Sequence, residues 1–81
     1  MRIKIYSKPD CPFCHRTKEF FQRRNISYDE KIVGDDITPE KFNRDYQTTV
    51  PAIFIDEKLI GGYDQLMVLY TVAPEFIEKY E

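Results

Sequence analysis

The most constraining feature of this sequence is the place where a β-rich segment gives way to a helix-forming one. Residues 2–7 alternate charged and apolar side chains, which predicts a strand. Residues 8–10 interrupt that pattern, and Pro12 suits the first position of a helix, where its missing N–H is no loss. Both cysteines of the chain, Cys11 and Cys14, lie at this junction. The chain is therefore expected to open with a strand that leads through its cysteines into a helix.

The rest of the chain alternates helical and β-rich segments. Apolar side chains recur with a helical period over residues 12–24, where Phe13, Phe20 and Phe21 are expected to supply most of the apolar surface. The other expected elements are, in order, a strand within 27–32, a turn at 34–36, a helix at 39–46 capped by Thr38, a hairpin of 52–55 with 59–60, a helix at 64–72, and a further helical turn containing Phe76, Ile77 and Tyr80.

The order of these elements, β-α-β-α-β-β-α, predicts an α/β fold. Strands joined by a helix pair in parallel through a right-handed crossover, whereas a hairpin adds an antiparallel pair. A four-stranded mixed sheet with helices on both faces follows, which is the arrangement of a thioredoxin-like fold. The 81 residues suffice for about one small domain, so residues 1–81 are expected to form a single unit.

Composition narrows the class of function. Lys and Arg total 12 against 14 Asp and Glu, so the net charge is −2 and no basic footprint for nucleic acid or an anionic membrane is expected. No apolar run approaches the ~20 residues of a membrane span. The first five residues alternate charge with apolarity and lack the apolar core of a signal peptide. These observations predict a soluble, cytoplasmic protein.

The two cysteines indicate chemistry rather than structural reinforcement. Cys11 and Cys14 are three positions apart, and a bridge that closes so short a loop restrains the unfolded chain very little. At a helix N-terminus, unpaired N–H groups and the helix dipole stabilise a thiolate, so a thiol pKa can fall from about 8.5 to roughly 3.5–7.5. We expect Cys11, at the cap, to be the attacking thiolate. Cys14, nearly one turn on and closer to the core, would resolve the mixed disulfide.

Other uses of this cysteine pair fit the sequence less well. Structural zinc normally takes four ligands, and Cys11, Cys14 and His15 supply at most three on one helical turn. The same residues formally match the C-x-x-C-H pattern of covalent haem attachment. That attachment usually follows export, and the β-rich second half of the chain leaves little room for a helical haem pocket. Inert core cysteines are disfavoured by a helix start beside Lys8 and Pro12.

Three motifs in this order give the chain a resemblance to a known family. They are the C-P-F-C sequence at 11–14, T-V-P at 49–51 and G-G-Y-D at 61–64. Together they strongly resemble the glutaredoxins, specifically the dithiol members with the signature C-P-[YF]-C, and the match extends from the first strand to the last helix. The G-G-Y-D-Q-L ending at 61–66 is similar to short bacterial or bacteriophage glutaredoxins.

The resemblance implies a glutathione site. It implies a cis bond between Val50 and Pro51, which is physically reasonable because cis bonds are almost confined to X-Pro, and it implies that the Val50 backbone pairs with the cysteinyl part of glutathione. The γ-glutamyl carboxylate would dock at the helix entrance after Gly61. Many family members have Ser/Thr-Asp where this chain has Asp64-Gln65, so Asp64 is expected to meet the glutathione ammonium instead. The residues expected to bind glutathione are Lys8, Phe13, Thr49, Val50, Pro51, Gly62, Tyr63, Asp64 and Gln65, with Arg44 and Gln47 as weaker candidates.

The implied activity is glutathione-dependent thiol–disulfide exchange. Glutathione would be a co-substrate, with no permanently bound cofactor and no metal, and the partners would be disulfide-containing or glutathionylated proteins, ribonucleotide reductase among the candidates. A monomer is expected. Two alternatives stay open: a redoxin that takes electrons from thioredoxin reductase, and a module that holds an iron–sulfur cluster between two subunits through Cys11 and glutathione. Pro12 stiffens the cysteine loop and, by the resemblance, disfavours the cluster.

Overall fold

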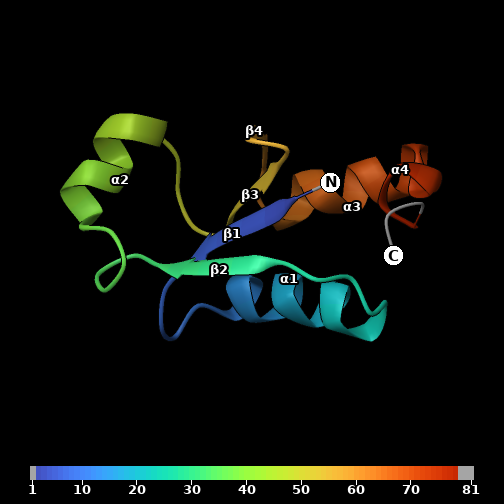
Figure 1. Ribbon diagram of the computed structural model, residues 1–81, viewed down its shortest axis with the longest axis horizontal. Coiled ribbons are helices and arrows are strands. Elements are labelled where there is room, and N and C mark those ends of the chain that lie inside the picture. Colours follow the sequence, from blue (N-terminus) through green and yellow to red (C-terminus); the bar gives the residue numbers. More distant parts are fainter. Residues whose placement is uncertain (1, 79–81) are drawn as a thin grey trace.

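A computed structural model describes residues 2–78 and confirms the expected order of elements (Figure 1). The helical turn expected at the end of the chain is α4, and Tyr80, which was expected in that turn, lies outside the described residues. The elements are β1 (Ile3–Ser7), α1 (Pro12–Arg23), β2 (Asp29–Ile32), α2 (Pro39–Tyr46), β3 (Ala52–Ile55), β4 (Lys58–Gly61), α3 (Tyr63–Val72) and α4 (Pro74–Glu78).

The four strands form one mixed sheet in the order β2-β1-β3-β4. β1 runs parallel to β2, with Ile5 opposite Glu30, and antiparallel to β3, with Ile5 opposite Ile53. β3 and β4 form the expected hairpin, with an irregular register between Ile53 and Phe54. The crossover between the parallel strands is α1, so the end of β1 and the start of α1 meet at one edge of the molecule. The cysteine junction lies there.

Helices cover both faces of the sheet, as expected, and each face has its own apolar cluster. Side chains alternate across a strand, so neighbouring residues of β1 and β3 enter different clusters. The cluster under α1 and α3 consists of Ile3, Ile5, Phe20, Phe21, Ile26, Ile53, Ile55, Leu66 and Ile77. The cluster under α2 consists of Tyr6, Phe42, Ala52 and Phe54. Figure 1 shows α2 standing apart from α1, on the other side of the strands.

Strand boundaries differ from expectation where backbone groups find other partners. β1 starts one residue late because Arg2 pairs with the hairpin turn: its N–H donates to Asp56 Oδ1 at 2.8 Å and its carbonyl accepts from the Asp56 N–H at 2.9 Å. β2 starts at Asp29 rather than at residue 27. β4 covers Lys58–Gly61 and is longer than the predicted 59–60 segment, because a bulged register lets Gly61 pair with β3.

Helix boundaries are set by their caps. α2 begins as expected, with Thr38 Oγ1 accepting from the Lys41 N–H at 3.1 Å. α1 ends one residue earlier than expected, and Arg24 is its C-cap, with its Nη1 donating to the Phe20 carbonyl at 3.0 Å. α3 begins one residue earlier than expected, with Gly62 as its N-cap.

Phe13 lies on the apolar side of α1 but outside the core. Its side chain is 49% exposed, whereas Phe20 is 7% exposed. Phe13 and Phe20 lie two turns apart on the same side of α1 and both face α3, where Phe20 packs edge-on against Tyr70 and Phe13 tilts against Tyr63. α3 only begins at Tyr63, so no further turn of helix covers Phe13.

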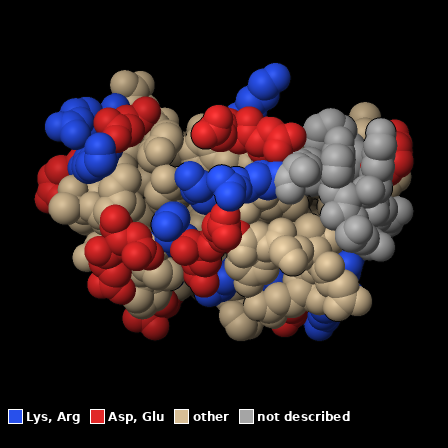
Figure 2. Space-filling model, in the orientation of Figure 1, with Lys and Arg blue, Asp and Glu red and all other residues tan. Residues whose placement is uncertain are grey.

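Charged side chains of both signs are interspersed over the surface visible in Figure 2, where Lys and Arg are bordered by Asp and Glu. This view shows no single-sign field, consistent with the small net charge of −2. Within residues 2–78, no helix combines the length and apolarity needed to cross a membrane.

Candidate functional site

The cysteine pair forms the first turn of α1. Asp10 takes a left-handed conformation (φ 58°) that turns the chain out of the loop after β1, and Cys11 is extended at the N-cap. Pro12 then occupies the first helical position. The two cysteines form a disulfide with Cα atoms 5.2 Å apart, so the structure represents the oxidised protein. Cys14 is 1% exposed and Cys11 is half-buried, which confirms that Cys14 lies closer to the core.

The sulfur of Cys11 faces the free N–H groups of the helix. Its Sγ accepts a hydrogen bond from the Cys14 N–H at 3.2 Å. The first turn of α1 contains no acidic residue. After reduction, backbone donors and the helix dipole at this position favour the charged form of the sulfur. The thiolate character of Cys11 stays a prediction, which the position of its sulfur at the helix start supports.

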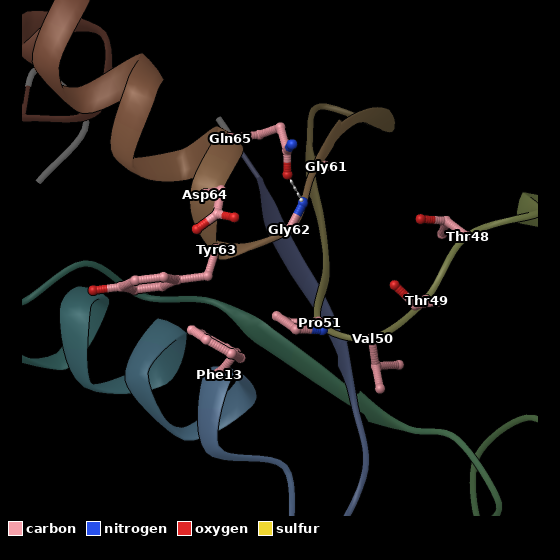
Figure 3. Close-up of a pocket in the computed structure, with 10 residues that line it drawn as sticks. All are labelled: Phe13, Thr48, Thr49, Val50, Pro51, Gly61, Gly62, Tyr63, Asp64 and Gln65. Carbon is pink, nitrogen blue, oxygen red and sulfur yellow. Dashed lines mark hydrogen bonds between the residues drawn. The ribbon is translucent and has the colours of Figure 1, made fainter.

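A groove of about 540 Å³ begins at Phe13, between the two cysteines in sequence (Figure 3). Three segments form it: the start of α1, the connection from α2 to β3, and the turn from β4 into α3. Its lining residues are Phe13, Thr48, Thr49, Val50, Pro51, Gly61, Gly62, Tyr63, Asp64 and Gln65. Of the nine residues predicted to bind glutathione, eight line this groove and Lys8 does not. The groove also contains Thr48, and Gly61 from the predicted helix entrance.

Two backbone segments approach each other closely at the groove. The Val50–Pro51 bond is cis, as expected from the resemblance. A Cβ added at Gly62 would lie 3.2 Å from the Pro51 carbonyl oxygen, so Gly62 allows the entrance of α3 to lie against the cis-proline turn. The two motifs, eleven positions apart in sequence, thereby become opposite walls of one groove.

The side chain of Gln65 secures the entrance of α3. Its Oε1 accepts a hydrogen bond from the Gly62 N–H at 2.8 Å, drawn as a dashed line in Figure 3. Gly61 adopts φ 120°, and a Cβ there would lie 2.6 Å from Gln65 Cγ. Gly61 is thus required both for its conformation and for the space that Gln65 fills.

Aromatic rings mark the end of the groove beside the cysteines. The rings of Phe13 and Tyr63 have centroids 5.9 Å apart and lie next to each other in Figure 3. The Arg16 guanidinium lies 5.2 Å from the Phe13 ring centroid. The exposed Phe13 therefore belongs to the rim of the site rather than to the core.

The predicted cation Lys8 lies outside this groove. It lines a separate depression of about 550 Å³ that also contains both cysteines, Asp10, His15 and Lys18. The weaker candidates Arg44 and Gln47 are not among the groove residues either. Arg44 pairs with Asp45 at 3.5 Å, and Gln47 is the left-handed C-cap of α2. The groove therefore contains a single formally charged side chain, Asp64.

A polar network under the cysteine loop was missed by the sequence prediction. Ser7 Oγ donates to Glu30 Oε2 at 2.5 Å, and Lys18 Nζ lies 2.9 Å from the same oxygen. Partial burial raises the pKa of Glu30, but the hydrogen bonds from Ser7 and Lys18 outweigh it, so this pKa is lowered from 4.5. The three residues belong to β1, α1 and β2, and only the parallel register of the strands brings them together.

Metal ligands do not gather in the part of the chain that the structure describes: no group of three or more His, Cys, Asp or Glu side chains there could hold an ion. His15 follows Cys14 directly and lines the depression with it.

Comparisons with known proteins agree with this geometry. The family model described as glutaredoxin matches residues 3–60. Glutaredoxin 3 of Escherichia coli K12 is 39% identical over 69 residues, which are 83% of each chain. The structure of glutaredoxin 1 from Francisella tularensis, complexed with cacodylate, superposes with a TM-score of 0.77 at 32% identity and covers 91% of this chain and 96% of that one.

A glutathione complex is among the similar structures. The buckwheat glutaredoxin–glutathione complex has a TM-score of 0.71 and 31% identity over 86% of this chain and 68% of that one. The family match, the relatives and the disulfide at the start of α1 agree with one another. The chain belongs to the glutaredoxin family and is a thiol–disulfide oxidoreductase of that family.

Proposed function

We propose that this protein uses glutathione as its electron donor and binds it in the groove between the cis-proline turn and the entrance of α3. The observation that carries the proposal is the position of the groove, which begins at Phe13 beside the disulfide and lies between the cis-proline turn and the entrance of α3. Glutathione is a tripeptide, and an extended peptide is recognised by main-chain pairing. The similarity to a glutaredoxin structure complexed with glutathione supports the same ligand.

The groove suggests how each part of glutathione is held. Thr49 and the Val50 backbone would pair with the cysteinyl residue, which places its sulfur toward Cys11. The start of α3 offers N–H donors to the γ-glutamyl carboxylate. Asp64 is the one charged side chain in the groove, and we assign it to the glutathione ammonium. Phe13 and Tyr63 would cover the cysteinyl end.

We assign Lys8 to stabilising the Cys11 thiolate rather than to binding glutathione. It lines the depression with Cys11 and is absent from the groove. A cation there favours the thiolate over the thiol.

The chemistry needs two electrons and two protons for each substrate disulfide. The Cys11 thiolate attacks a substrate disulfide, forms a mixed disulfide and releases the other substrate sulfur as a thiolate, which takes a proton. The Cys14 thiolate then attacks Cys11 Sγ and releases the second substrate thiol. Two glutathione molecules reduce the resulting disulfide and leave as glutathione disulfide. With a glutathionylated substrate, Cys11 takes the glutathione, and a second glutathione attacks that adduct.

The proposed substrates are disulfide-containing or glutathionylated proteins, and ribonucleotide reductase is one family-level candidate.

The electron donor is identified by coupling turnover of the protein to NADPH oxidation through two different reductases. The protein is supplied with a peptide disulfide and NADPH, first with glutathione and glutathione reductase, then with thioredoxin reductase alone. We expect rapid NADPH oxidation only in the first system. Turnover with thioredoxin reductase at an equal or higher rate would contradict the proposal.

A further inference from the structure

The depression that contains both cysteines also contains a lysine close to the buried Cys14. Lys18 follows Cys14 by four positions in α1, and both residues line the depression. Side chains four positions apart lie one above the other on a helix face, with Cβ atoms about 5–6 Å apart. Lys18 is therefore close enough to act electrostatically on the Cys14 sulfur once the disulfide opens.

Lys18 is held in place more firmly than the other paired lysine or arginine side chains described. Its side chain is 29% exposed and that of Glu30 is 28% exposed, whereas the Lys41–Asp45 pair has 56% and 35%. Glu30 is itself anchored by Ser7, which is 1% exposed. Ser7 is the last residue of β1, so the network is fixed to the sheet directly before the cysteine loop. A charge held this way keeps its distance from Cys14 and is screened less than a freely solvated one.

The other charged groups around the depression do not replace Lys18. Lys8, Asp10 and His15 also line it, but Lys8 and Asp10 belong to the exposed loop before Cys11. Arg16, on the exposed side of α1, lies over the Phe13 ring. Glu30, from β2, is the carboxylate that directly faces Lys18. Lys18 is thus the cation of this set that a rigid network orients.

We propose that Lys18 stabilises the thiolate of Cys14 when the disulfide opens, and that Glu30 and Ser7 are positioning residues that hold its ammonium group. An incoming thiolate attacks Cys11 Sγ and forms a new S–S bond there. The Cys11–Cys14 bond breaks, and its electron pair leaves with Cys14 Sγ, which later takes a proton from water. A leaving thiol with a lower pKa departs faster. In the reverse direction, the same charge raises the fraction of Cys14 able to resolve a mixed disulfide.

This inference needs only thiol–disulfide exchange at the pair and is independent of glutathione as donor. The test is built on the Cys11→Ser variant, in which Cys14 is the sole thiol. Its pKa is read from the ultraviolet absorbance of the thiolate, with Cys11→Ser/Cys14→Ser as the blank. We expect Lys18→Gln to raise the Cys14 pKa by about one unit, since it removes the cation and leaves the Glu30 carboxylate. Lys18→Arg should stay near the parent value.

A second substitution separates electrostatics from a structural role. In Lys18→Gln/Glu30→Gln the unpaired carboxylate is gone as well, so the Cys14 pKa should return part of the way to the parent value. Lys41→Gln, which breaks an exposed pair on α2, is the matched control and should leave the pKa unchanged. If Lys18→Gln does not fold, Lys18→Met keeps the aliphatic stem and takes its place.

The kinetic consequence is measured in the chain with both cysteines intact. Lys18→Gln should slow opening of the disulfide by 2-mercaptoethanol about threefold, because an exchange rate follows roughly the square root of such a change in thiol acidity. The double variant should recover part of that loss. An unchanged Cys14 pKa in Lys18→Gln would overturn the inference, as would a double variant no closer to the parent than the single one. Failure of glutathione coupling would overturn the proposed donor and leave this result untouched.

Discussion

The groove and the depression, which both border the disulfide, are lined by different kinds of residue. On one side, the groove from Phe13 to Gln65 is lined by a cis-proline turn, two glycines, threonines and one carboxylate. On the other, the depression holds both cysteines among Lys8, Asp10, His15 and Lys18. A lining with few charges gives a shape in which a peptide can lie, whereas fixed charges change the acidity of a thiol. Under the two proposals above, the groove binds the ligand and the charges of the depression set the acidity of the thiols.

The largest expected effect comes from the cysteines between the two sides. Cys11→Ser should lose all activity, because the remaining thiol, Cys14, is 1% exposed and cannot reach a substrate disulfide. Cys14→Ser should lose the reduction of protein disulfides and keep the removal of glutathione from glutathionylated proteins, which needs one cysteine only. Steady-state assays with each type of substrate measure the split. Turnover retained by Cys11→Ser would contradict the assignment of Cys11 as the attacking thiol.

In the groove, substitution of Gly61 by alanine is expected to destabilise the protein more than the same substitution at Gly34, which has a similar backbone conformation. Gly61 and Gly34 have φ of 120° and 108°, but a Cβ at Gly34 meets nothing within 4 Å, whereas one at Gly61 meets Gln65 at 2.6 Å. Gly34→Ala should cost about 1 kcal/mol of unfolding free energy from backbone strain alone. Gly61→Ala should cost about 3 kcal/mol, because Gln65 must also move.

Urea unfolding of the two glycine variants gives the free energies, and the KM for glutathione reports the groove. Gly34→Ala should leave that KM unchanged, since Gly34 lies in the turn after β2. Equal stability losses in the two variants would show that the contact between Gly61 and Gln65 does not shape the groove.

A smaller effect is expected at the single charge of the groove. Asp64→Asn should raise the KM for glutathione about threefold and leave the rate with dithiothreitol unchanged, since a partly exposed ion pair contributes about 0.5–1 kcal/mol. Asp35→Asn, in the exposed turn after β2, is the matched control. A KM that does not respond to Asp64→Asn would assign the glutathione ammonium elsewhere.

The smallest effect concerns pH and belongs to the depression side. The folded-state pKa of Glu30 is lowered, so the stability it contributes is present above the ordinary carboxyl value of 4.5 and is lost as the pH falls through the folded pKa. Glu30→Gln should therefore cost about 0.5 kcal/mol near neutral pH and progressively less in acid.

Urea unfolding of wild type and Glu30→Gln at neutral and at acidic pH checks this sign. Asp35→Asn should show the same small difference at both pH values. A Glu30→Gln effect that grows as the pH falls would contradict the Ser7–Glu30–Lys18 network.

Local signals in the sequence were enough for much of the fold and of the groove. A cysteine before a proline places the start of α1, Thr38 before a proline places the start of α2, and an apolar run followed by a charged turn gives the hairpin. Each of these depends on neighbours within one turn of chain. The two glycines that precede α3 also marked a wall of the groove.

Other features depend on how the helices and strands pack against one another and could not be predicted from the sequence. Phe13 shares its helix face with Phe20, but its exposure depends on where α3 begins. The Ser7–Glu30–Lys18 network joins residues from three elements through a strand register that no local pattern encodes. Lys8, which was predicted to bind glutathione as a cation, lines the depression with the cysteines and is absent from the groove, and no local pattern indicates which of the two it lines.

The most direct test of the account is the acidity of Cys11. In Cys14→Ser the rate of alkylation by iodoacetamide is followed against pH, so that the titration belongs to Cys11 alone. With its sulfur at the N-cap of α1, we expect a pKa well below the value of about 8.5 for a free cysteine. A midpoint at the free-cysteine value would contradict the claim that the helix start makes this sulfur a thiolate at neutral pH.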